Sequence, residues 1–65
     1  MRIPSELRRL RVVLGLRLFD VQTATGIEGS MLSRAERGER KLSPEAEQRL
    51  RDFYRQAQRE AEEAA

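Results

Sequence analysis

Glycines at positions 15, 26 and 38 divide the first part of the chain into short segments whose apolar residues have helical spacing. In the first segment, Leu7, Leu10 and Leu14 follow one another at intervals of three and four residues, which places them on one helix face. Val21 and Ala24 show the same spacing in the second. Glycine commonly ends helices because it adopts the left-handed conformation without steric cost. The pattern therefore predicts three short helices, each ended by a glycine.

A fourth helix is predicted from residue 44. Ser43 is a favoured N-cap, Pro44 suits the first helical position, and Glu45 suits the positive end of the helix dipole. No Gly or Pro follows, so we expect the helix to continue towards the end of the chain, with residues 60–65 frayed. The expected core consists of Leu7, Leu10, Leu14, Val21, Ile27, Leu32, Leu50 and Phe53.

The size and composition of the chain exclude several classes of function. Its 65 residues make one small domain, which we assign to residues 1–65. It contains no Cys and no His, which excludes disulfides, thiol nucleophiles, imidazole bases and Cys/His zinc sites. We therefore expect no catalytic residues, metal, cofactor or small-molecule ligand. The longest apolar run, at 12–14, is too short to span a membrane.

The charges are unevenly distributed along the chain. Residues 1–42 carry nine basic and five acidic residues, whereas residues 43–65 carry four basic and six acidic ones. All the cations except Lys41 are arginines, whose planar fork suits phosphates and guanine edges. This distribution favours a polyanionic partner for the first part of the chain.

Several short motifs occur together in the middle of the chain. Gly26-Ile27 precedes Leu32-Ser33-Arg34 and Glu36-Arg37-Gly38, with LRRLR before them at 7–11 and ERKLSPE after them at 39–45. Residues 5–54 thereby resemble the Cro/repressor-type helix-turn-helix family, also called the xenobiotic-response-element (XRE) family. The resemblance implies an all-α, lambda-repressor-like domain of four short helices with a C-terminal helical extension. Its motif would occupy residues 17–37, and the helix around 29–37 would enter the DNA major groove.

The resemblance also implies which residues contact DNA. Arg34 would read a guanine and Met31 a thymine methyl group, while the cations that follow would contact phosphates. A solvated surface, with these cations paired to glutamates, is the alternative interpretation. Arg11 and Glu36 are expected to form a structural ion pair. The expected DNA-binding residues are Arg17, Gly29, Ser30, Met31, Ser33, Arg34, Arg37, Arg40 and Lys41.

Four positions depart from the family pattern. Family members usually have Thr or Ser at 17, Gln at 18, Ala at 22, and Ser or Thr at 28. This chain has Arg17, Leu18, Gln22 and Glu28 instead. The substitutions remove the usual caps of both helices of the motif, and they place a carboxylate where DNA phosphates would repel it.

The implied function is sequence-specific binding of double-stranded DNA by a small transcriptional regulator, cytoplasmic and of bacterial or phage origin. A homodimer on a palindromic operator would double the few contacts of so small a domain. The alternative is a protein-interaction adaptor that binds RNA polymerase or another regulator. A structural or RNA-binding module is a third, weaker interpretation.

We expect Tyr54 to be half-buried with its hydroxyl in water. Candidate protein-contact residues are Leu18, Phe19, Phe53, Tyr54 and Ala57.

Overall fold

The computed structural model describes residues 6–64, and every regular element in this range is an α-helix. The helices are α1 (Glu6–Val13), α2 (Leu18–Thr25), α3 (Gly29–Glu36) and α4 (Pro44–Ala64). For the described residues, the prediction of an all-α architecture with four helices is therefore confirmed. The third helix ends one residue before the predicted boundary at 37.

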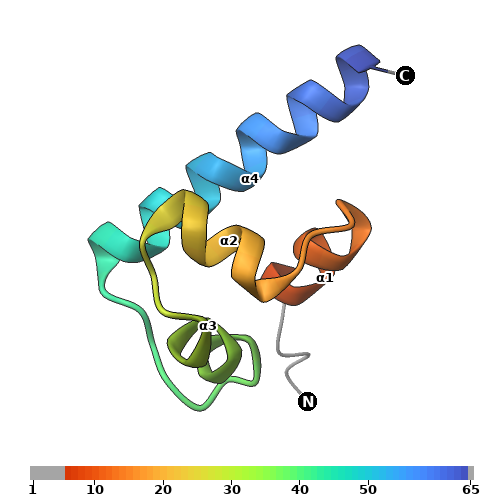
Figure 1. Ribbon diagram of the computed structural model, residues 1–65. Coiled ribbons are helices and arrows are strands. Elements are labelled where there is room, and N and C mark those ends of the chain that lie inside the picture. Colours follow the sequence, from red (N-terminus) through yellow and green to blue (C-terminus); the bar gives the residue numbers. More distant parts are fainter. Residues whose placement is uncertain (1–5, 65) are drawn as a thin grey trace.

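The second helix occupies the centre of the arrangement. It contacts both α3 and α4, and α1 contacts α3. Figure 1 shows α3 running at a steep angle to α2, and the C-terminal half of α4 extending away from the other helices. Residues 60–64, for which the sequence predicts fraying, are helical and exposed.

The core lies where α2, α3 and α4 meet. Its buried members are Val21, Ile27, Leu32, Leu50 and Tyr54. A ring of partly buried apolar residues packs against them: Leu7, Leu10, Leu14, Leu16, Leu18, Met31, Leu42, Ala46 and Phe53. The leucines of α1 therefore cover the core rather than lie within it.

Two further predictions about burial, those for Phe53 and Tyr54, are wrong. Tyr54 is only 1% exposed and has its hydroxyl inside the protein, whereas Phe53 is only partly buried beside it.

In α2, Ala24 is exposed and the neighbouring Thr25 is buried. The Thr25 hydroxyl donates to the Val21 carbonyl oxygen at 2.8 Å and accepts from the Ile27 amide at 3.2 Å, so its burial leaves no lost hydrogen bond.

The helix boundaries follow from local signals. Gly15, Gly26 and Gly38 all have positive φ, as the sequence predicts. At the start of α4, the Ser43 hydroxyl accepts a hydrogen bond from the Ala46 amide at 3.1 Å, so Ser43 is the expected N-cap. These residues act through near neighbours in the sequence, which is why the pattern locates the helices well.

Candidate nucleic-acid interface

The connection between α2 and α3 is short and fixed by hydrogen bonds. Gly26 adopts φ 78°, a left-handed conformation that is costly for residues with a β-carbon, and its amide donates to the Gln22 carbonyl oxygen at 2.8 Å. Ile27 follows and is buried. Arg49 of α4 donates through Nη1 to the Thr25 carbonyl oxygen at 3.0 Å, so it satisfies a carbonyl at the end of α2. The turn is therefore fixed by the hydrogen bonds at Gly26 and Thr25 and by the burial of Ile27.

A side chain of α2 reaches the first residue of α3. Gln22 Oε1 accepts a hydrogen bond from the Gly29 amide at 2.7 Å. This amide is one of those at a helix start that have no partner within the helix. Gln22 thus acts as a cap from the preceding helix, a role that reasoning from the sequence missed because the two residues are seven positions apart. Since the amide is already used, Gly29 has no free backbone donor for the DNA contact that the sequence analysis assigned to it.

The inner face of α3 is locked to α1 by an ion pair. Arg11 Nε and Nη2 donate to the two carboxylate oxygens of Glu36 at 2.7 and 2.9 Å, and Nη1 donates to the Leu16 carbonyl oxygen at 3.1 Å. The side chains are 14% and 6% exposed. The hydrogen bond to Glu36 raises the pKa of Arg11. The expected pair between Arg11 and Glu36 is therefore present, and it fixes the position of α3 through a two-point contact.

The Tyr54 side chain lies close to this pair. Within the part of the chain that the structure describes, its hydroxyl is the one buried side-chain polar atom without a hydrogen-bond partner. Burial raises the pKa of Tyr54 to about 12, the Glu36 carboxylate adds to the rise, and the Arg11 guanidinium opposes it. The hydroxyl is consequently a neutral group in the interior near neutral pH.

The outer face of α3 presents fewer accessible side chains than expected. Ser30 and Arg34 are exposed, whereas Ser33 is half-buried and accepts a hydrogen bond from Arg37 Nη1 at 2.6 Å. Met31 is also half-buried and packs against the core, so much of its surface is withdrawn from any groove contact. The Arg34 side chain makes no hydrogen bond or ion pair with another residue of 6–64, although its charge contributes to the lowered pKa of Glu39. Arg34 is therefore the main available donor on this face.

The remaining cations differ in how they are paired. Arg37 forms an ion pair with Glu39 at 2.9 Å, which raises the pKa of Arg37 and lowers that of Glu39. Arg17 is 84% exposed and lies 3.4 Å from Asp20, whose pKa is lowered mainly by the hydrogen bond from the Arg17 amide. That carboxylate bonds to the Arg17 amide at 2.8 Å, so α2 has a local hydrogen bond at its start although Arg17 is no side-chain cap.

The segment after α3 adds exposed charge. Arg40 and Lys41 are exposed and make no ion pair among residues 6–64.

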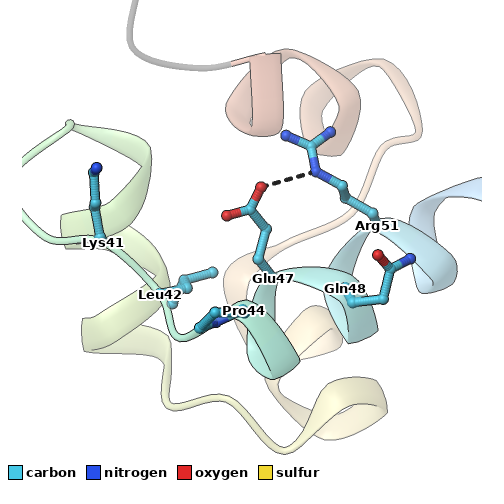
Figure 2. Close-up of a pocket in the computed structure, with 6 residues that line it drawn as sticks. All are labelled: Lys41, Leu42, Pro44, Glu47, Gln48 and Arg51. Atoms are coloured by element: carbon cyan, nitrogen blue, oxygen red, sulfur yellow. Dashed lines mark hydrogen bonds and ion pairs between the residues drawn. The ribbon is translucent and has the colours of Figure 1, made fainter.

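Lys41 also borders a shallow cavity of about 470 Å³ between this segment and α4, in which Glu47 lies 3.1 Å from Arg51 (Figure 2). The cavity therefore contains groups of both charges. It is lined by Lys41, Leu42, Pro44, Glu47, Gln48 and Arg51.

Three large apolar side chains are exposed at α1 and α2. Phe19 is 70% exposed, Val13 75% and Val12 55%. Leu18 is half-buried against the core, and Ala57 on α4 is also half-buried. The rings of Phe53 and Tyr54 are tilted with centroids 5.6 Å apart. Of the candidate protein-contact residues, Phe19 is therefore the most accessible, whereas Tyr54 is removed from any surface.

Two further features of the described chain concern metals and membranes. Residues 6–64 contain no group of three or more Asp or Glu side chains arranged to hold a metal ion. Within the same range, no helix combines the length and apolarity needed to cross a membrane.

No protein-family model, curated protein or solved structure matches the chain. Its function is therefore inferred from its own sequence and geometry.

Proposed function

We propose that this chain is a lambda-repressor-like helix-turn-helix domain that binds double-stranded DNA sequence-specifically, as a small transcriptional regulator in the bacterial or phage-infected cytoplasm. In this proposal α2 crosses the phosphate backbone and α3 lies in the major groove. The short glycine turn and the steep angle between α2 and α3 support this assignment (Figure 1).

One observation carries the proposal: the inner face of α3 is fixed to the rest of the protein, whereas its outer face has an accessible arginine. Its inner face is anchored by Leu32 and by the hydrogen bonds that Arg11 donates to Glu36. Its outer face leaves Arg34 exposed and uncommitted within residues 6–64. A guanidinium on a rigid, exposed helix can donate two hydrogen bonds to guanine O6 and N7, which is the commonest specific contact between proteins and DNA.

The cations around α3 provide the sequence-independent part of the interaction. Arg40 and Lys41 are available for phosphates, and Arg37 becomes available when a phosphate replaces Glu39 as its partner. Arg17 is placed at the start of α2 with most of its side chain in solvent. The proposed phosphate contacts thus come from the start of α2 and from the segment that follows α3.

A random-sequence DNA selection followed by binding measurements tests the proposal. We expect the parent protein to enrich a defined motif, and Arg34→Ala to lose about 1–3 kcal/mol of binding energy on that motif and relax one base pair. Arg59→Ala is the matched control, because Arg59 is exposed near the far end of α4. Equal loss of affinity by Arg34→Ala on the motif and on random DNA would refute the base-reading role.

We further propose that the DNA-bound form is a homodimer. Two half-sites about 34 Å apart would match two copies related by a twofold axis. The C-terminal half of α4 extends from the body and carries the apolar positions Phe53, Ala57 and Ala61 on one face, so it is the surface available for pairing. Sedimentation should show two copies on the selected duplex. A monomer both free and on DNA would end this part of the proposal.

The exposed Phe19 supports a second candidate, a protein-interaction adaptor with the same fold. Phe19 is 70% exposed on α2, and accessible aromatic rings are enriched in the contact surfaces of protein complexes. This candidate predicts no motif in the DNA selection, together with a bound protein such as RNA polymerase that is lost on Phe19→Ser. Retention of that partner by Phe19→Ser would exclude it.

A further inference from the structure

Glu28 immediately precedes α3, and its carboxylate does not cap the helix. A residue at this position usually accepts a hydrogen bond from an amide of the first turn. Here the side chain makes no such bond, although the backbone of Glu28 has the non-helical dihedral angles of an N-cap residue, φ −56° and ψ 140°. Instead, Glu28 Oε1 accepts a hydrogen bond from the Ser30 hydroxyl at 3.3 Å. The carboxylate therefore lies at the exposed start of α3, beside the exposed Ser30.

Gln22 explains how α3 tolerates this arrangement. Its side-chain oxygen takes the Gly29 amide at 2.7 Å, so part of the capping at this helix start comes from α2. A β-carbon on Gly29 would lie 3.1 Å from that oxygen, which shows how closely the two residues pack. With Gln22 in the capping position, Glu28 is available for another partner.

The charge on Glu28 restricts what that partner can be. No cation of residues 6–64 lies within ion-pair distance of its carboxylate. Enclosing an unpaired carboxylate in an interface with DNA is unfavourable unless a hydrogen-bond donor satisfies it. In the major groove, guanine offers only acceptors, and the favoured donor to a carboxylate is the N4 amino group of cytosine.

We propose that Glu28 is a specificity-determining residue that selects cytosine at one position of the DNA site. The inference rests on the proposed function, because it requires α3 to lie in the major groove. Glu28 accepts the cytosine amino proton and repels the acceptors of guanine, so it discriminates by attraction and by repulsion together. Ser30, which donates to the same carboxylate, is a positioning residue.

The test compares three variants in a random-sequence DNA selection, followed by titration of fluorescent duplexes. Glu28→Ala removes the acceptor, and Glu28→Gln converts it into the amide group that favours adenine. Glu45→Gln is the matched control, because it removes the same charge from an exposed glutamate that makes no ion pair with another residue of 6–64. Circular dichroism of each variant establishes that the helices are intact.

The parent should enrich cytosine at one position and lose about tenfold in affinity when guanine replaces it. Glu28→Ala should abolish that preference and bind random DNA more tightly, and Glu28→Gln should change the preferred base from cytosine to adenine. Glu45→Gln should leave every base preference unchanged. A parent motif that both Glu28 variants keep at every position would overturn this inference alone. A parent that enriches no sequence would overturn the proposed function as well.

Discussion

Gln22 Oε1 accepts a hydrogen bond from the Gly29 amide at 2.7 Å, so a side chain near the end of α2 caps the start of α3. The bond crosses the turn between two helices that are only eight residues long. Because such short helices have little stability of their own, contacts of this kind decide how firmly the pair is held.

Replacing Gln22 with alanine should therefore destabilise the protein. Loss of the acceptor leaves the Gly29 amide without its partner, and we expect a cost of about 1 kcal/mol, as for other lost caps. Urea denaturation followed by circular dichroism measures it. Gln56→Ala on the exposed side of α4 is the control and should leave the midpoint unchanged. Equal midpoints for the two variants would show that the Gln22 contact contributes nothing.

Breaking the ion pair between Arg11 and Glu36 should have a larger effect. Arg11→Ala leaves the 6% exposed Glu36 carboxylate without a counter-charge, which typically costs about 3–5 kcal/mol. A destabilisation at the lower end of this range is expected here, because the Arg11 side chain keeps some solvent contact. Arg55→Ala, which removes an exposed arginine 3.8 Å from Asp52, should leave the unfolding midpoint close to that of the parent. The prediction fails if both variants unfold at the same urea concentration.

Substitution of Gly26 tests the turn between α2 and α3. Its φ of 78° is unfavourable for residues with a β-carbon, so Gly26→Ala should cost about 1–2 kcal/mol in the free energy of unfolding. The added β-carbon would lie 4.0 Å from Arg49 Nη1, so the cost is conformational rather than steric. Gly26→Asn should cost less, because asparagine adopts this conformation more readily. Equal stability of the alanine and asparagine variants would contradict this explanation.

Tyr54 gives the protein a pH-dependent stability at alkaline pH. Its pKa is raised from 10.0 to about 12, so above pH 10 the unfolded chain loses this proton before the folded protein does. Stability is therefore fully present below pH 10 and falls as the pH rises towards 12. Because the chain contains one Tyr and no Trp, the tyrosinate absorption band reports on this hydroxyl directly.

Tyr54→Phe is the variant that isolates this effect. It removes a buried hydroxyl that has no partner within residues 6–64, so near neutral pH its stability should equal or exceed that of the parent by up to about 1 kcal/mol. Its unfolding midpoint should also fall less steeply with rising alkaline pH. A parallel decline in both proteins would assign the alkaline loss to other groups.

Salt dependence distinguishes the proposed phosphate contacts from base contacts. The logarithm of the DNA affinity should fall linearly with the logarithm of the salt concentration, with a slope of about −0.9 for each neutralised phosphate. Arg40→Ala should reduce the slope by about one unit and weaken the selected motif and random DNA alike. An unchanged slope would remove Arg40 from the interface.

The positions of the four helices could be predicted from the sequence, because each depends on residues close together in the chain. The glycines with positive φ, the Ser43 cap and the three-and-four spacing of leucines act through neighbours within about one helical turn. The pair between Arg11 and Glu36 was expected only through a family resemblance, since 25 positions separate its members.

Tertiary packing decided what local patterns leave open. Phe53 and Tyr54 are adjacent and about 100° apart around α4, so the rotation of that helix against α2 determines that Tyr54 is the buried ring. The same packing brings Gln22 to Gly29 and Arg49 to Thr25. Such contacts join groups that no local spacing relates, and only the assembled helices bring them within hydrogen-bond distance.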